Sequence, residues 1–101
     1  SIRWWHRVDE AKKGVEFCIN GFINHYPDFL AMTAGGRVLA IETKGEQLKN
    51  DDSRDKLNLG SRWAMMAGSR YRYFMVFDHD AIDADGSYAL AEFREILAEM
   101  E

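Results

Sequence analysis

The sequence has little of what holds small disulfide-rich or metal-stapled proteins together. Its single cysteine, Cys18, cannot form a disulfide within the chain, and no Cys and His spacing matches a structural zinc site. One proline and 47% hydrophobic residues in 101 positions exclude collagen-like and disordered chains. No apolar run approaches the roughly 20 residues that cross a bilayer, so we expect no membrane association and a cytoplasmic location. We therefore expect a single domain over residues 1–101, held by a hydrophobic core.

A strong excess of positive charge is also missing. The net charge is −4, but residues 1–77 carry 12 Lys and Arg against 9 Asp and Glu, whereas residues 78–101 carry 1 against 8. The acidic residues are thus concentrated at the end of the chain. This distribution is compatible with a polyanion site in the first three quarters, although a surplus of three positive charges does not by itself predict strong binding to nucleic acid.

Hydrophobic periodicity predicts an α/β chain. We expect strands over Ile2–Val8, Val15–Asn20, Phe22–Thr33 and Arg37–Lys44, a helix from Asn50 to Gly68, a strand over Tyr71–Phe77 and a final helix over Tyr88–Met100. Pro27 interrupts the third strand because it lacks a ladder donor, and Ala34-Gly35-Gly36 predicts a hairpin turn. Strands followed by helix, strand and helix imply one sheet covered by helices.

Three ionisable residues come together if the two strands around this turn pair as a hairpin. Glu42 and Lys44 are i and i+2 on one strand, so both project from the same face, about 7 Å apart. Asp28, within Tyr26-Pro27-Asp28-Phe29, would lie across from Glu42. Two carboxylates at a strand end suit Mg²⁺, and a lysine beside them suits phosphate chemistry. The alternative is a solvated sheet face on which Glu42 and Lys44 simply form an ion pair.

Further motifs accompany this arrangement in a fixed order. They are Trp4-Trp5-His6-Arg7, Asn20-Gly21, Ile41-Glu42-Thr43-Lys44-Gly45-Glu46, Lys56-Leu57 with Leu59-Gly60 and Trp63, and Tyr73-Phe74-Met75-Val76-Phe77. In order and spacing the set resembles the nucleases with the Pro-Asp…(Asp/Glu)-x-Lys signature. Within them it is similar to the C-terminal endonuclease domain of type III restriction enzymes and related helicase-linked restriction proteins. The resemblance implies a restriction-endonuclease-like fold, a mixed β-sheet flanked by helices.

The resemblance also implies a role for each signature residue. Asp28 and Glu42 would ligate Mg²⁺, the Thr43 carbonyl would be a further ligand, and Lys44 would orient or help to deprotonate the attacking water. The implied reaction is hydrolysis of DNA phosphodiester bonds in a prokaryotic type III restriction-modification system. The implied partners are DNA, a modification (methyltransferase) subunit and a helicase portion of the same, longer polypeptide. ATP would serve only that motor, because this chain has no Gly-x-x-x-x-Gly-Lys motif.

Several other residues have two interpretations. Arg54, Asn58 and Arg62 recur every four residues and predict either a phosphate-contacting helix face or solvated surface. Lys56 is a similar candidate because it resembles a recurrent family position. His25 is close enough in sequence to Asp28 to approach a phosphate, and the alternative is a neutral, hydrogen-bonded histidine.

Two questions stay open from the sequence alone. Trp4, Trp5 and Trp63 could stack on bases, but we expect them in the core, where large aromatic residues of strands and apolar helix faces are usually found. An extra acidic metal ligand occurs in many members of the wider superfamily, and Glu46 is a candidate through a water molecule. The alternative to an active nuclease is a non-catalytic DNA-binding or assembly module with the same fold.

Overall fold

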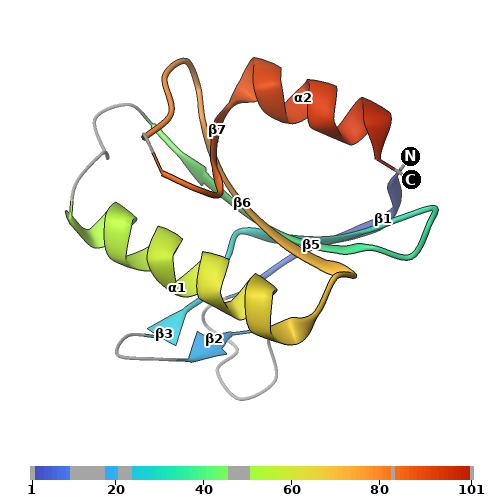
Figure 1. The fold of residues 1–101 in the computed structure, drawn as a ribbon, viewed down its shortest axis with the longest axis horizontal. Coiled ribbons are helices and arrows are strands. Elements are labelled where there is room, and N and C mark those ends of the chain that lie inside the picture. The colour runs from blue at the N-terminus through green and yellow to red at the C-terminus, as the bar shows by residue number, and fades with distance from the viewer. Residues whose placement is uncertain (1, 10–17, 21–23, 46–50, 83, 101) are drawn as a thin grey trace.

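The structure is a computed structural model that describes residues 2–9, 18–20, 24–45, 51–82 and 84–100 (Figure 1). Glu46 lies outside these residues, as does most of the strand expected over Val15–Asn20. In chain order the elements are β1 (Ile2–Arg7), β2 (Ile19–Asn20), β3 (Asn24–His25), β4 (Phe29–Thr33), β5 (Val38–Lys44), α1 (Asp51–Ala67), β6 (Tyr71–Phe77), β7 (Ser87–Ala89) and α2 (Leu90–Glu99).

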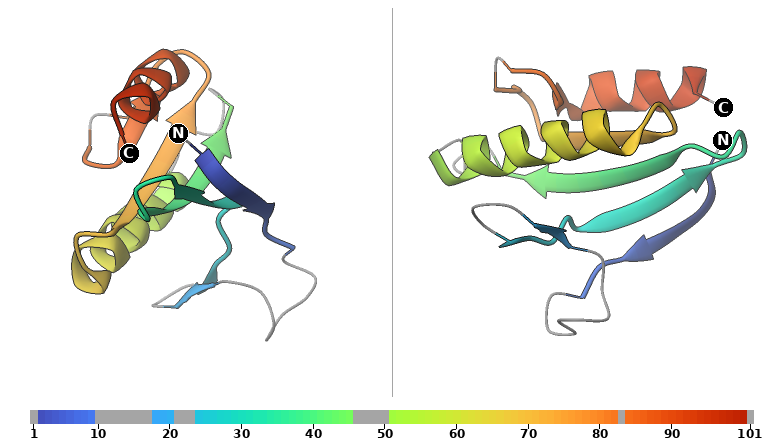
Figure 2. Two further views of the ribbon diagram at one scale, coloured as in Figure 1. Left: turned by 90° about the vertical axis from the view of Figure 1, so that its right-hand side faces the viewer. Right: turned by 60° about the horizontal axis from the view of Figure 1, so that its bottom comes forward.

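Five strands form a mixed sheet in the order β1-β4-β5-β6-β7, and β2 and β3 form a separate antiparallel pair. The first three strands are antiparallel, whereas β5, β6 and β7 run parallel. A parallel neighbour requires a crossover connection, and α1 supplies it between β5 and β6 (Figures 1 and 2). The expected α/β architecture, a mixed sheet with helices packed on it, is confirmed.

The core lies on both faces of β6, whose last five residues are all buried. Tyr73, Met75 and Phe77 pack towards α1 together with Leu57 and Leu59. On the opposite face, Phe74 and Val76 pack with Leu39 of β5 and with Phe93 of α2. Burial on both faces explains why β6 is an almost continuous apolar run instead of an alternating one.

Glycines with positive φ end two of the elements near the positions that the sequence predicts. The β4–β5 hairpin turns at Gly36, which has φ +88° and donates its N–H to the Thr33 carbonyl at 3.0 Å. Helix α1 ends before Gly68, whose φ of +117° lies in the left-handed region that favours glycine. The hairpin, this helix and the strand Tyr71–Phe77 are therefore confirmed. The strand expected over Phe22–Thr33 is divided into β3 and β4, with Pro27 between them.

Two expectations are wrong. The last helix begins at Leu90 instead of Tyr88, because Ser87–Ala89 pairs with β6 as the strand β7. The Glu92 carboxylate accepts the Ala89 N–H at 3.1 Å, which is a contact of the first helical turn.

The tryptophans of β1 are not core residues. Trp4 is 43% and Trp5 is 65% exposed, because β1 is the edge strand. Trp63 of α1, in contrast, is half-buried against the core.

The longest helix described is too short and too polar to cross a lipid bilayer, and the same holds for α2.

Candidate active site

Asp28 is fixed by the strands on both sides of it. It directly precedes β4, and its carbonyl accepts the Val8 N–H from the end of β1 at 2.8 Å. Its carboxylate atom Oδ2 accepts two hydrogen bonds from Thr43, one from the backbone N–H at 2.8 Å and one from the hydroxyl at 2.7 Å. The hairpin therefore brings the Asp28 carboxylate to the end of β5, as the sequence predicts.

Glu42 lies on β5 between Asp28 and Lys44. Its side chain is largely buried, and Oε1 accepts the backbone N–H of Asp28 at 3.1 Å. Its second oxygen, Oε2, lies 3.4 Å from Lys44 Nζ. The Lys44 side chain is only 11% exposed, so this is a sheltered ion pair and not a pair on a solvated face. The structure thus brings all three signature residues into one hydrogen-bonded cluster.

The electrostatics of the cluster favour binding of a cation. Burial, together with the neighbouring Asp28 carboxylate, raises the pKa of Glu42 to about 7 against the opposing charges of Lys44 and Lys56. A buried carboxylate beside a second carboxylate is unstable in its charged form unless positive charge is supplied. A divalent cation would supply such charge in addition to that of the two lysines.

The available ligands are two carboxylates and backbone oxygen. Within the described ranges no group of three or more His, Cys, Asp or Glu side chains gathers around one point. Mg²⁺ does not need such a cage, because it usually keeps several waters and binds through one or two carboxylates. The described hydrogen bonds of Asp28 use Oδ2, and Thr43 directs its amide to this edge of β5. In a strand the carbonyl of the same residue points to the same edge, so the oxygen atoms here are of the kind that Mg²⁺ binds, although both Glu42 oxygens and Asp28 Oδ2 already contact protein groups.

His25 is close to the cluster but does not face solvent. It is 1% exposed, and its Nε2 atom lies 2.7 Å from the hydroxyl of Tyr73 on β6. Burial, together with the charges of Lys56 and Lys44 and against those of Asp28 and Asp52, lowers the pKa of His25 to about 4. His25 is therefore the neutral, hydrogen-bonded histidine of the second interpretation, and it ties the segment before Asp28 to β6.

The basic residues of α1 divide into two groups. Lys56 forms an i,i+4 ion pair with Asp52 at 3.4 Å, and its charge acts on both His25 and Glu42. Arg54 and Arg62 are exposed along the helix. The charge of Lys56 thus reaches the cluster, whereas Arg54 and Arg62 belong to the exposed surface of α1.

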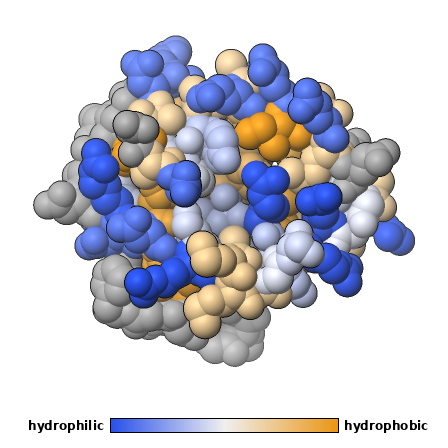
Figure 3. Space-filling view, viewed as in Figure 1, coloured by the Kyte–Doolittle hydropathy of each residue, from blue (hydrophilic) through white to orange (hydrophobic). Residues whose placement is uncertain are grey.

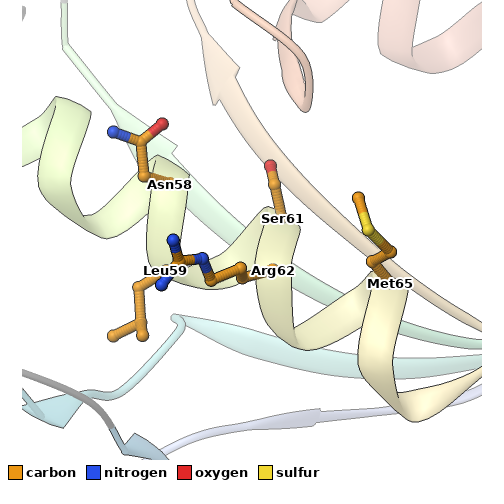
Figure 4. A pocket seen from close by; sticks show the side chains of 5 residues that line it. All are labelled: Asn58, Leu59, Ser61, Arg62 and Met65. Carbon is orange, nitrogen blue, oxygen red and sulfur yellow. The ribbon is translucent and has the colours of Figure 1, made fainter.

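Arg62 instead contributes to a shallow surface pocket of about 350 Å³ along α1 (Figure 4). Asn58, Ser61 and Met65 rise from one side of the helix in this view, with Leu59 on the other. All of these lining residues belong to α1, and none of them is a residue of the carboxylate cluster.

Sequence reasoning assigned no role to Tyr73. Its hydroxyl contacts the buried His25, and burial together with the Glu42 and Asp28 charges raises the pKa of Tyr73. The available signal was a tyrosine within a fully buried strand, since a buried tyrosine hydroxyl usually has a hydrogen-bond partner. Which partner it has depends on the fold, because His25 and Tyr73 are 48 positions apart.

The fold and the cluster define a mixed α/β domain with two carboxylates and a lysine at one end of its sheet. Comparisons of the chain with protein-family models, curated proteins and solved structures give no match.

Proposed function

We propose that this chain is a Mg²⁺-dependent endonuclease domain that hydrolyses DNA phosphodiester bonds, of the kind found in type III restriction systems. The observation that carries the proposal is the sheltered cluster of Asp28, Glu42 and Lys44, in which each signature residue contacts another through a hydrogen bond or an ion pair. A merely structural sheet face would not need to bury Glu42 beside a second carboxylate.

The topology supports a restriction-endonuclease-like fold. An antiparallel meander of β1, β4 and β5 is followed by the crossover helix α1 and by β6, which runs parallel to β5. Asp28 directly precedes β4 and Glu42 lies on β5, the neighbouring strand of this sheet.

The proposed chemistry assigns separate tasks to the residues of the cluster. Asp28, Glu42 and the Thr43 carbonyl would hold Mg²⁺, which lowers the pKa of a bound water and neutralises negative charge that grows on the phosphate. Lys44 would orient the attacking water and, through its positive charge, help that water to lose its proton to solvent. The water oxygen would form a bond to phosphorus while the bond to the 3′ oxygen breaks, and the 3′ oxygen would take up a proton from solvent, leaving a 5′-phosphate and a 3′-hydroxyl. Lys56 would hold the phosphate charge nearby.

The partners follow from the resemblance and belong to the proposal. A modification subunit would read the target sequence, and an ATP-driven helicase portion of the same polypeptide would move the DNA. One active centre cuts one strand, so a double-strand break needs a second copy of the domain.

Nicking of supercoiled plasmid in Mg²⁺ tests the proposal. Asp28→Asn, Glu42→Gln and Lys44→Ala are each expected to lower the rate by about 10²-fold or more, the typical cost of losing one electrostatic contact to the transition state. Asp55→Asn removes an exposed carboxylate of α1 and is the matched control, expected to cut as the wild type does. Unchanged nicking by all three cluster variants would overturn the assignment.

The alternative, a non-catalytic DNA-binding or assembly module, is favoured by one observation. The cluster offers only two carboxylates in the described part of the chain, and Lys44 is already paired with Glu42. This module would bind DNA, take up no Mg²⁺ and cut nothing in the same assay.

A further inference from the structure

A buried polar contact between His25 and Tyr73 has no part in the chemistry proposed above. Both residues are buried, and the Nε2 atom of His25 lies 2.7 Å from the Tyr73 hydroxyl. The two rings meet nearly edge to face, with centroids 5.6 Å apart and an interplanar angle of 68°. Two apolar side chains of similar shape could fill this space without desolvating polar groups, so packing alone does not account for the contact.

The contact lies on the same face of the sheet as the carboxylate cluster. Tyr73 pairs in register with Ala40 of β5, and Glu42 is two residues further along that strand. Side chains of a strand alternate between its faces, so Glu42 and Lys44 share the face of Ala40, which packs with Tyr73 in the core beneath α1. Two residues of a strand span about 7 Å. The Tyr73 ring therefore lies in the row of side chains next to that of Glu42.

The strand that leads to Asp28 needs an anchor on this sheet. In the described part of the chain, β3 pairs with β2 and not with the five strands that carry the cluster. The position of β3 relative to the sheet therefore depends on side-chain contacts, and His25 supplies one that reaches β6. The Nδ1 atom of His25 is buried and has no hydrogen-bond partner among the described residues. The Tyr73 hydroxyl is thus the group that orients the imidazole ring.

The connection from His25 to Asp28 is short and stiff. It consists of Tyr26 and Pro27, and the Pro27 side chain is fully buried. The proline ring fixes its own φ, and the residue before a proline is confined to extended conformations. Three residues of chain span at most about 10 Å. A displacement of His25 is therefore passed on to Asp28.

Asp28 closes a ring of contacts that runs through both strands of the core. Its backbone N–H donates to Glu42 Oε1 at 3.1 Å, and its Oδ2 atom accepts the Thr43 N–H at 2.8 Å. Glu42 and Thr43 belong to β5, which pairs with β6. Through Tyr73, β6 contacts His25 and so the segment that leads to Asp28. The cluster is thus held from β5 on one side and from β6 on the other.

Helix α1 fixes the Tyr73 ring and separates it from solvent. A Cβ atom added at Gly60 would lie 2.5 Å from three atoms of this ring, so the helix backbone lies directly against it. Leu57 packs in the same core, whereas hydrophilic side chains cover much of the outer surface of α1 (Figure 3). A ring held in this way has little freedom, so its hydroxyl is already in place to hold His25.

We propose that His25 and Tyr73 are positioning residues that hold Asp28 at the end of β5, acting through the chain and not through contact with metal or DNA. The inference rests on the proposed nuclease function and assigns to it the groups that keep its first carboxylate in place. A displacement of about 1 Å can cost roughly 10²-fold in rate. Tyr73→Phe is therefore expected to lower kcat for plasmid nicking by about 10-fold or more and to leave KM for the plasmid unchanged.

Amide hydrogen exchange, followed by NMR in EDTA, tests the positioning without metal, DNA or cleavage. Tyr73→Phe removes only a hydroxyl, and the amides of Asp28 and Thr43 are expected to exchange about 10-fold faster, the range for one lost buried hydrogen bond. The Val38 amide donates to the Arg70 carbonyl at the far end of β5 and should exchange as in the wild type. Tyr71→Phe removes a hydroxyl from the same strand and is the matched control, expected to change none of the three amides.

Two variants of His25 separate the hydrogen bond from the ring. The side-chain amide of glutamine reaches about as far as the histidine Nε2 atom, whereas that of asparagine reaches only about as far as Nδ1. His25→Gln is therefore expected to keep the contact with Tyr73, and with it slow exchange at Asp28 and most of the nicking rate. His25→Asn should lose both.

Three results in these variants would overturn the proposal. They are wild-type exchange at Asp28 and Thr43 in Tyr73→Phe, equal acceleration of all amides including Val38, and identical behaviour of His25→Gln and His25→Asn. The second result would mean that the pair contributes only to overall stability. The Tyr73 and His25 variants are compared separately, so a variant that does not fold leaves the other comparison to decide.

Failure of the nuclease function would be recognised separately. A wild type that neither nicks DNA nor binds Mg²⁺ would contradict that function, while exchange at Asp28 would still show whether the pair holds this residue in place. A rise in KM at unchanged kcat in Tyr73→Phe would contradict the positioning role in an active nuclease.

Discussion

Glu42 is a buried acid whose charged form is unfavourable where the fold places it. It is buried beside Asp28, with one oxygen at the Asp28 amide and the other at Lys44. The arrangement is unfavourable for a metal-free protein, since the charged form of Glu42 is held next to a like charge. Sites that bind cations commonly carry such a conflict, and stability lost there is recovered when the cation binds.

The conflict predicts a gain in stability from Glu42→Gln. The pKa of Glu42 rises from 4.5 to about 7 on folding. As the pH rises, Glu42 loses its proton near pH 4.5 in the unfolded chain and near pH 7 in the folded protein. The free energy of unfolding is therefore highest below pH 4.5 and falls as the pH rises to about 7. Glutamine stays neutral, so above pH 7 we expect a gain on the order of 1 kcal/mol, reduced by the unpaired Lys44 that the change leaves behind.

Urea unfolding in EDTA at pH 5 and pH 8 measures this effect. Wild type should lose stability between the two pH values by more than Glu42→Gln does. Glu95→Gln, an exposed change on α2, is the matched control and should follow the wild type. The same pH dependence in all three proteins would show that Glu42 is not the buried acid described above.

At the scale of elements, the sequence predicted those elements whose signals are short-range. The hairpin turn, the period-2 pattern of β5 and the glycine after α1 each depend on a few consecutive residues. For this reason β5, α1 and β6 lie where the sequence predicts them. From the hairpin it also followed that Asp28 meets Glu42. These are local relationships, and local patterns carry them.

The features that the sequence did not predict depend on contacts between residues that are far apart in the chain. β7 has three residues and no period of its own, and it is a strand only because β6 is beside it. The exposure of Trp5 follows from the position of β1 at the edge of the sheet, which its composition does not encode. The contact of His25 with Tyr73 spans 48 positions, so a local pattern could not have indicated it.

The close approach of α1 to β6 predicts a strong effect of one methyl group. A Cβ atom added at Gly60 would lie 2.5 Å from three atoms of the Tyr73 ring, a distance that real Cβ atoms do not show. Gly60→Ala should therefore destabilise the protein by about 1 to 2 kcal/mol, because overpacking outweighs the better helix propensity of alanine. The ring holds the His25 contact, so the change also disturbs the segment that leads to Asp28.

A double-mutant cycle checks the cause. Gly60→Ala combined with Tyr73→Ala should cost less than the sum of the two single changes, since the shortened side chain removes the clash. The measurement is the free energy of urea unfolding of the four proteins. Strict additivity, or a Gly60→Ala variant more stable than wild type, would contradict the packing described for α1 and β6.

At the scale of the whole molecule, two features meet on the face of the sheet that α1 covers. The carboxylate cluster lies at the end of β5, and Lys56 of α1 places positive charge beside it. The acidic residues are concentrated in the last quarter of the chain, which contains β7 and α2. The signature residues Asp28, Glu42 and Lys44 therefore lie in the part of the sequence that carries less negative charge.

The central claim is that Asp28 and Glu42 form one divalent-cation site, and calorimetric titration of Mg²⁺ tests it most directly because it needs neither DNA nor a partner. Wild type is expected to give a saturable heat of weak binding to one site. Asp28→Asn should abolish it, and Asp55→Asn, an exposed carboxylate on α1, should leave it unchanged. Titration curves of wild type and Asp28→Asn that superimpose would contradict the account.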